Sequence, residues 1–216
     1  MKINFLGDSI TAGAGASVLE KSYVREVERA LACQVRNYGI SGTRIAKQSK
    51  PSAMAEYDLD FQMRAKEMDE DADLVFVFGG TNDWGHGDGA IGELGDNNPY
   101  TFYGGLQNLI EILLKKYPID KITFLLPLRR YGEENPYGEG NKEKPSLPLR
   151  GYAEILKAVL AQYKIAYLDF YENGLPTPLT NVESEWFSDG VHPNDKGHIW
   201  LAGKIVEYIT SKEQKE

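Results

Sequence analysis

Residues 2–11 have the sequence KINFLGDSIT, a short apolar run that gives way abruptly to small and polar residues. An apolar run of this length beside a turn is typical of a buried β-strand. Ser9 is therefore predicted to lie where a strand ends, at the rim of a sheet. In open α/β sheets, ligands bind in the crevice outside the carboxyl ends of the strands. We therefore interpret Ser9 as a candidate nucleophile to which the rest of the chain must bring partners.

The rest of the chain alternates between predicted strands and predicted helices. Apolar runs predict strands at residues 2–6, 35–38, 73–78, 121–126 and 165–170. Apolar residues at helical spacing predict helices from about residue 22 to 31, around 106–113, at about 149–163 and after Pro193, with part of 52–71 also helical. This alternation predicts a mostly parallel sheet of about five strands with helices on both faces.

Length and composition are those of an ordinary globular protein. The chain has 216 residues, 42% hydrophobic and 26% charged, and we expect a single domain over residues 1–216. Its formal net charge of -8 argues against a nucleic-acid partner, which requires clustered Lys and Arg. With Cys33 as the only cysteine, an intrachain disulfide is excluded.

The sequence predicts neither a membrane span nor a targeting segment. No apolar run is long enough to cross a bilayer, and no charged region leads into an apolar stretch before the first strand. We therefore expect a cytoplasmic protein. The oligomeric state stays open at this point.

Four short stretches of small and polar residues follow predicted strands or precede the last helix. They are GDS at 7–9, GISG at 39–42, GGTND at 79–83 and DGVH at 189–192. Because the carboxyl ends of parallel strands share one edge of a sheet, we expect the stretches to converge there. Together they contain what acyl transfer to a serine requires: a hydroxyl, an imidazole base, a carboxylate, and donors for an oxyanion.

The spacing of Asp189 and His192 fits the pairing of a carboxylate with a base. Three residues apart in a turn, the two side chains can lie on the same side of the chain. The carboxylate can then hold Nδ1–H and leave Nε2 to face Ser9. Since the base must be neutral, activity is expected to fall below about pH 6 to 7, the range of an ordinary imidazole.

These stretches resemble the conserved blocks of a known family. The matching segments are GDSI at 7–10, NYGISG at 37–42, GTND at 80–83 and DGVHP at 189–193. In this order they resemble the SGNH-hydrolase family, also called the GDSL-type esterases and lipases. Ile10 stands where the family's common name has Leu, which exchanges one apolar residue for another.

The resemblance implies a fold, a reaction and a set of roles. The implied fold is a flavodoxin-like three-layer α/β/α sandwich. The implied nucleophile is Ser9, with His192 as general base and Asp189 as the residue that orients it. The implied oxyanion hole combines the backbone N–H groups of Ser9 and Gly42 with the side-chain amide of Asn82. No cofactor is implied, and the partner is a small-molecule ester.

The leading hypothesis is a serine esterase that acts on small acyl esters, with an acetylated carbohydrate as the specific expectation. Aromatic residues and long polar loops near the predicted crevice motivate this expectation. The candidate substrate contacts are Trp84, Arg129, Tyr131 and Trp186. Arg130 and Arg150 also flank the long loop 129–148. We expect solvated side chains there or pairs with its Glu residues, with a substrate contact by one of these arginines as the alternative.

Other functions remain open at this point. They are a lipase or thioesterase of the same family, a binding protein without catalysis, and a flavodoxin-like nucleotide- or phosphate-binding module with its cradle at residues 7–17. Against the nucleotide- or phosphate-binding module, the sequence lacks both the dinucleotide glycine pattern and the phosphate-loop Gly-Lys-Ser/Thr. An α/β-hydrolase is disfavoured because no Gly-X-Ser-X-Gly occurs.

The remaining histidines receive ordinary roles. His86 is interpreted as a solvated residue of a Gly-rich loop, and His198 as a surface or packing residue of the last helix. A metal site has to be considered because four potential ligands recur every three residues: Asp189, His192, Asp195 and His198. We predict no metal, because Asp195 can cap the helix and the two histidines lack the i, i+4 spacing of helical metal ligands.

Overall fold

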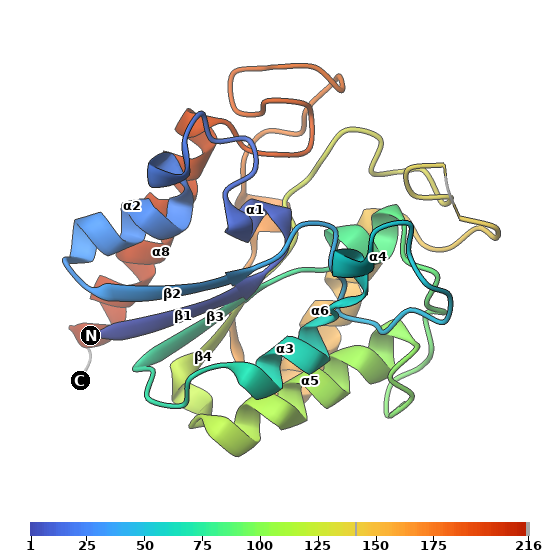
Figure 1. The fold of residues 1–216 in the computed structure, drawn as a ribbon, viewed down its shortest axis with the longest axis horizontal. Coiled ribbons are helices and arrows are strands. Elements are labelled where there is room, and N and C mark those ends of the chain that lie inside the picture. Colours follow the sequence, from blue (N-terminus) through green and yellow to red (C-terminus); the bar gives the residue numbers. More distant parts are fainter. Residues whose placement is uncertain (141, 215–216) are drawn as a thin grey trace.

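The computed structural model describes residues 1–140 and 142–214 and is built on one five-stranded sheet (Figure 1). The strands are β1 (Lys2–Gly7), β2 (Gln34–Gly39), β3 (Leu74–Phe78), β4 (Ile122–Leu125) and β5 (Ala166–Leu168). Their order is β2-β1-β3-β4-β5, and all four neighbouring pairs are parallel. The predicted five-stranded parallel sheet is confirmed.

Five helices of seven residues or more cover the sheet. They are α2 (Tyr23–Leu31), α3 (Phe61–Glu67), α5 (Phe102–Lys116), α6 (Leu149–Tyr163) and α8 (Asp195–Glu213). Three short helices follow strand ends: α1 (Ser9–Ala12), α4 (Thr81–Gly85) and α7 (Phe170–Asn173). Residues 1–140 and 142–214 also contain three 3₁₀ turns: η1 (Leu19–Lys21), η2 (Ala55–Asp58) and η3 (Ile119–Lys121).

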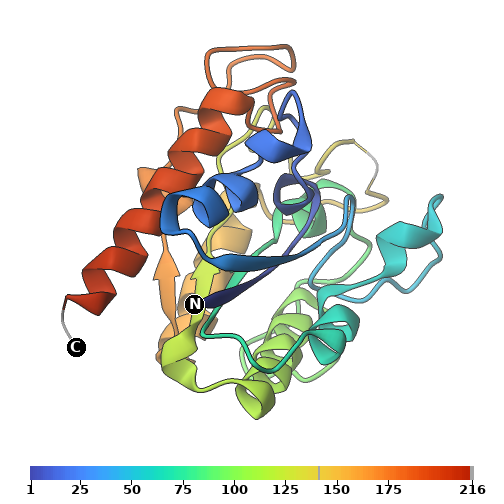
Figure 2. The same ribbon diagram turned by 60° about the vertical axis from the view of Figure 1, so that its left-hand side comes forward.

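The alternation of side chains along β3 divides the core into two layers. Val75 and Val77 pack with α3, α5 and α6, whereas Phe76 and Phe78 pack on the opposite face with α2 and α8. Figures 1 and 2 show these two groups of helices on opposite sides of the sheet. Burying one such Phe or Val stabilises the fold by roughly 1.5–3 kcal/mol. The three-layer α/β/α architecture is therefore confirmed.

The strand register aligns the loops that carry the candidate residues. Gly7, the last residue of β1, pairs with Gly39 of β2 and with Phe78 of β3. The loops that follow these three residues therefore leave the sheet at the same level. They contain Ser9, Gly42 and Asn82.

The sequence missed the three short helices that follow β1, β3 and β5. Helices of four or five residues are too short to display the apolar periodicity that identifies a helix. Side-chain caps stabilise two of them instead. The Asp8 side chain accepts the Ile10 backbone N–H at 3.0 Å in α1, and the Asp169 side chain accepts the Glu172 N–H at 3.0 Å in α7.

Across residues 1–140 and 142–214, no helix combines the length and the hydropathy needed to cross a membrane.

Candidate active site

Ser9 is the first residue of α1, directly beyond the end of β1. Its side chain is almost buried, and its Oγ lies 2.9 Å from Nε2 of His192. The loop after α1 reaches His192 because Gly15, at φ 90°, lacks a side chain. A Cβ there would lie 2.2 Å from the Pro193 carbonyl oxygen. The two ends of the chain therefore meet at this edge of the sheet.

Asp189 and His192 form the pair that their spacing predicts. Asp189 Oδ2 lies 2.7 Å from His192 Nδ1, and Asp189 Oδ1 accepts the backbone N–H groups of Val191 and His192 at 2.9 and 2.8 Å. Burial alone would raise the pKa of Asp189, but the hydrogen bonds from His192 outweigh burial and hold it below its ordinary value. An ionised Asp189 can only accept a hydrogen bond, so Nδ1 of His192 carries the ring proton. The lone pair of Nε2 then faces Ser9.

The first residues of α8 support this turn. The Asn194 side chain caps α8 by accepting the N–H groups of Lys196 and Gly197 at 3.1 and 3.2 Å. Asp195 accepts the backbone N–H and the hydroxyl of Ser17 and pairs with Lys21 at 2.6 Å. Of the two predicted caps, Asn194 therefore takes that role, and Asp195 links α8 to the loop beyond Ser9.

Ser9, His192, Gly42 and Asn82 line one cavity of about 590 Å³. Gly42 has φ 73°, and a Cβ on it would lie 2.4 Å from the ring of Tyr57. A residue with a side chain is therefore excluded at this wall. Asn82 lies in the first turn of α4, and one of its Nδ2–H groups donates to the Thr43 carbonyl at 3.0 Å. The structure thus brings both predicted oxyanion donors to the cavity that contains Ser9.

Two charged side chains and one imidazole of this cavity were not predicted as site residues. They are Arg44, Glu139 and His86, and they join Arg130, which the sequence placed beside the long loop with a substrate contact as the alternative. Arg44 directly follows the Gly-X-Ser-Gly-Thr segment, which was the one available signal for it. The other three come from loops whose approach depends on tertiary packing.

The interpretation of His86 as a solvated residue is wrong. Its Nδ1 lies 2.9 Å from an Nη1 of Arg44. A guanidinium group can only donate, so Nδ1 accepts and the ring carries its proton on Nε2. Burial first, and then the charge of Arg44, lower the pKa of His86 to about 4.

None of the four predicted substrate contacts lines the cavity at Ser9. Trp84 is only 1% exposed, and its Nε1–H donates to the Asn135 carbonyl at 3.2 Å. It lies in the core because α4 turns this side chain toward α6, a helix that loop composition could not reveal.

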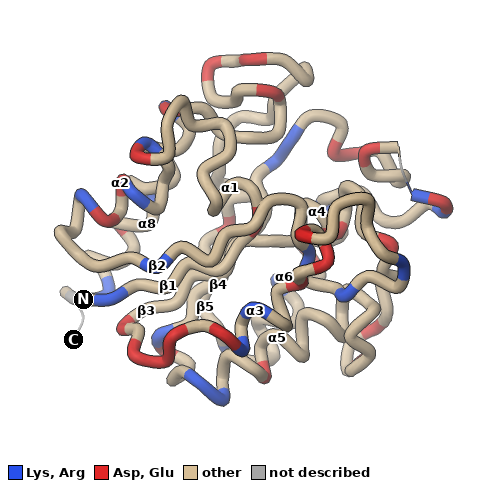
Figure 3. Tube along the Cα trace, in the orientation of Figure 1, with Lys and Arg blue, Asp and Glu red and all other residues tan. Residues whose placement is uncertain are grey.

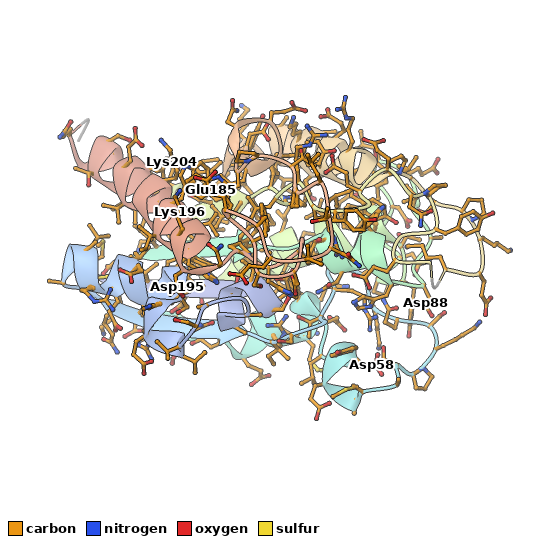
Figure 4. All side chains as sticks on the ribbon, turned by 90° about the horizontal axis from the view of Figure 1, so that it is seen from above. Asp58, Asp88, Glu185, Asp195, Lys196 and Lys204 are labelled. Atoms are coloured by element: carbon orange, nitrogen blue, oxygen red, sulfur yellow. The ribbon has the colours of Figure 1, made fainter. Side chains whose placement is uncertain are left out.

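The other three predicted contacts lie outside the cavity. Arg129 pairs with Glu133, and Tyr131 is 44% exposed. The Lys196 ammonium group lies 4.2 Å from the centre of the Trp186 ring. It also pairs with Glu185, which is labelled in Figure 4.

The buried His198 has no free ring nitrogen. Nδ1 accepts the Tyr23 backbone N–H at 3.1 Å, so Nε2 carries the proton and donates to the Ala14 carbonyl at 3.0 Å. Burial lowers its pKa. Within the described ranges 1–140 and 142–214, no three or more His, Cys, Asp or Glu side chains are grouped as metal ligands.

A parallel α/β/α sandwich with these strand-end loops has the architecture of the GDSL/SGNH hydrolases. Residues 5–199 match the model of the GDSL-like Lipase/Acylhydrolase family. The chain belongs to this family, and the resemblance seen in its four sequence segments is confirmed.

Solved structures show the same fold. A protein from Lactobacillus plantarum has 27% identity and a TM-score of 0.78, with 97% of this chain and 96% of that chain covered. A lipase/acylhydrolase from Enterococcus faecalis has 23% identity, a TM-score of 0.66 and coverage of 98% and 96%. A carbohydrate acetylesterase from Sinorhizobium meliloti has 17% identity, a TM-score of 0.66 and coverage of 97% and 98%. No curated protein matches this chain.

Proposed function

We propose that this protein is a serine esterase that hydrolyses small acyl esters, acetyl esters in particular, through a covalent acyl-enzyme on Ser9. One observation carries the proposal: Ser9 Oγ, the His192 ring and the Asp189 carboxylate form a continuous line of contacts of 2.9 and 2.7 Å. A base within hydrogen-bond reach of a hydroxyl, and itself oriented by a third group, is the arrangement that activates a serine.

The reaction follows from these contacts. Ser9 Oγ attacks the ester carbonyl carbon while His192 Nε2 takes the hydroxyl proton. The carbonyl oxygen becomes an oxyanion, for which the N–H groups of Ser9, Gly42 and Asn82 are the donors. His192 then gives its proton to the departing alcohol. Water then attacks the acyl carbonyl carbon while His192 Nε2 takes its proton. His192 returns this proton to Ser9 Oγ as the acyl–oxygen bond breaks, which releases the acid and restores Ser9.

The cavity favours a short acyl chain over a lipid. Its apolar lining is limited to a few side chains, Ala14, Ala53, Tyr57 and Val191, among mostly polar neighbours. A long acyl chain would need a continuous apolar channel to offset its desolvation. This composition supports an esterase over a lipase. A thioester of a short acid would fit the same cavity and is the second candidate substrate.

An acetylated carbohydrate remains the specific candidate for the alcohol part. Its support is the number of polar and charged side chains among the lining residues, together with a fold shared with the acetylesterase from Sinorhizobium meliloti. The aromatic residues first expected to stack on a sugar lie elsewhere, and Tyr57 is the one Tyr, Phe or Trp among the cavity-lining residues described.

The phosphate-binding alternative is disfavoured by the first turn of α1. A phosphate cradle offers free backbone N–H groups at a helix start. Here the Asp8 carboxylate accepts the Ile10 N–H at 3.0 Å, which puts a negative charge where the anion would have to bind.

The test is a panel of 4-nitrophenyl acetate, butyrate and palmitate, an acetylated xylose and an acetyl thioester, with Ser9→Ala as the variant. We expect the acetate to be preferred and Ser9→Ala to lose at least about 10³-fold in kcat. Ser17→Ala, which removes a hydroxyl bonded to Asp195 rather than to His192, is the matched control and should retain activity. Equal turnover by wild type and Ser9→Ala would refute the proposal.

A further inference from the structure

Two buried arginines line the cavity that contains Ser9. Arg44 comes from the loop after β2 and Arg130 from the loop that leaves β4, where residues 129–130 form a blue stretch in Figure 3. Their side chains are only 3% and 6% exposed. Arginine is rarely buried to this degree unless its donors are paired.

Contacts within the protein satisfy Arg44 only in part. Its Nη2 contacts the Ser52 hydroxyl, the Tyr57 carbonyl and the Asp58 carboxylate at 2.6, 2.9 and 3.2 Å, and its Nη1 contacts His86. The Nε–H has no acceptor in the described part of the chain. Asp58 lies at the surface of the molecule (Figure 4), with a third of its side chain exposed. Solvent therefore screens the one carboxylate that bonds directly to Arg44, although the buried Asp83 also lies close enough to act on its charge.

Arg130 has even fewer hydrogen-bond acceptors for its donors. Its Nη2 donates to Glu139 at 2.7 Å, and its guanidinium group lies 4.9 Å from the ring of Trp84. Neither Nε nor Nη1 has an acceptor among residues 1–140 and 142–214. A buried donor left without a partner costs about 1–3 kcal/mol, and more when it carries charge. Stacking on Trp84 and the pair with Glu139 explain where the group lies but leave these donors unused.

His86 adds a third donor to the same wall. Because Arg44 occupies Nδ1, the ring proton is on Nε2, and the imidazole is neutral. Arg44, Arg130 and His86 therefore offer N–H groups and no lone pair of their own to a group in the cavity. Among the described residues, Glu139 is the single carboxylate that lines the cavity with them.

A second hollow of about 640 Å³ continues this basic wall. It shares Arg44 and His86 with the first cavity and is also lined by Lys50, Lys142 and Lys144. Asp88 and Glu143 are its acidic residues. Among the described residues that line the two hollows, basic side chains thus outnumber acidic ones, although the whole chain has a net charge of -8. An excess of one charge sign in a cleft attracts ligands of the opposite sign.

We infer that the ester substrate carries a carboxylate, bound by Arg44 and Arg130 while its ester group lies at Ser9. The inference rests on the proposed esterase function. A carboxylate accepts charge-assisted N–H bonds from guanidinium groups. The unused donors are themselves covered, so binding requires the two side chains to turn toward the cavity. A phosphate dianion fits less well, because its second charge would face Glu139.

Two matched pairs of esters test this and separate the acyl side from the alcohol side. Mono-4-nitrophenyl glutarate is compared with 4-nitrophenyl valerate, and 4-acetoxybenzoate with its methyl ester. For wild type we expect kcat/KM of the charged ester to exceed that of the neutral one by about tenfold or more in one pair. In Arg130→Gln and Arg44→Gln this ratio should fall about 10- to 100-fold, the value of a charged hydrogen bond.

Arg25→Gln is the matched control, since it removes the same charge from the exposed face of α2 and should keep the wild-type ratio. A competition assay on the wild type needs no variant to fold. Sodium glutarate should inhibit hydrolysis of the neutral ester competitively, whereas sodium chloride at equal ionic strength should not. Stronger inhibition by inorganic phosphate than by glutarate would overturn the choice of a carboxylate.

The possible failures are distinguishable. Ser9-dependent hydrolysis of the neutral esters, with no preference for the charged member of either pair, would overturn the inference and leave the esterase function standing. An unchanged ratio in both Arg variants would do the same. Wild-type turnover in Ser9→Ala would refute the proposed function, and the inference with it.

Discussion

Asp189 holds His192 through both its ring and its backbone. Oδ2 contacts the ring Nδ1 at 2.7 Å, and Oδ1 accepts the backbone N–H at 2.8 Å. One carboxylate therefore fixes the position of the residue and the orientation of the imidazole together. The third residue of this line, Ser9, meets the ring from the other end of the sequence.

The pairing of Asp189 with His192 predicts a large effect of Asp189→Asn. The Asn oxygen can still accept the backbone N–H, but its NH₂ group would face Nδ1 and favour the tautomer with the proton on Nε2. That tautomer cannot take the proton of Ser9, so we expect kcat to fall about 10²- to 10⁴-fold with little loss of stability. Steady-state kinetics on 4-nitrophenyl acetate provide the measurement.

Asp195→Asn is the matched control for this substitution. Asp195 lies on the same helix start but contacts Ser17 and Lys21 rather than the His192 ring. It should retain wild-type kcat. A kcat for Asp189→Asn within tenfold of wild type would mean that Asp189 does not set the tautomer of the base.

Asn82→Ala is expected to lower kcat rather than raise KM. One Nδ2–H of Asn82 donates to the Thr43 carbonyl, which leaves the second for an oxyanion in the cavity. An interaction made only in the transition state lowers kcat and kcat/KM equally, here by about 10²- to 10³-fold. A rise in KM at unchanged kcat would assign Asn82 to ground-state binding instead.

The parts of the fold that the sequence predicted are those with a strong local signal. The run DLVFVF at 73–78 is apolar on both faces, and β3 is buried between two helix layers. Asp189 and His192 were identifiable as a pair because a three-residue turn brings them together by itself. Their approach to Ser9 followed from the shared edge of parallel strands.

The parts that the sequence missed depend on contacts between distant loops. Trp84 and His86 lie two residues apart, yet one is in the core and the other beside the Ser9 cavity. The short helix α4, which has no periodic signal, sets this difference. Arg44 and Arg130 come together across 86 positions of sequence, and loop composition contains nothing that specifies such a meeting.

The titration of His86 should not contribute to the pH dependence of activity. Burial and the charge of Arg44 lower the pKa of His86 to about 4, so this ring stays neutral between pH 5 and 8. Because a general base must be neutral to accept the Ser9 proton, we expect kcat/KM to fall on acidification. His86→Gln should keep this decrease with the same midpoint. Its disappearance in His86→Gln would assign the titration to His86.

Asp8→Asn should stabilise the protein above about pH 6. Burial raises the pKa of Asp8 from 3.8 to about 6, against the opposing effects of the Ile10 N–H and the charges of His192 and Arg64. The folded state therefore binds this proton more tightly than the unfolded state does. The resulting stabilisation is complete below about pH 4 and is lost as the pH rises to about 6, a difference of up to about 3 kcal/mol.

The variant should remove this pH dependence and keep the helix start. The oxygen of an Asn side chain can still accept the Ile10 N–H, and the amide does not titrate. Urea unfolding at pH 4 to 8 should therefore give a free energy of unfolding for Asp8→Asn that exceeds wild type at pH 8, by an amount that shrinks toward pH 4. Asp120→Asn, at an exposed position of η3, is the control and should follow wild type throughout. A difference between Asp8→Asn and wild type that stays constant with pH would show that Asp8 titrates alike in the folded and unfolded chains.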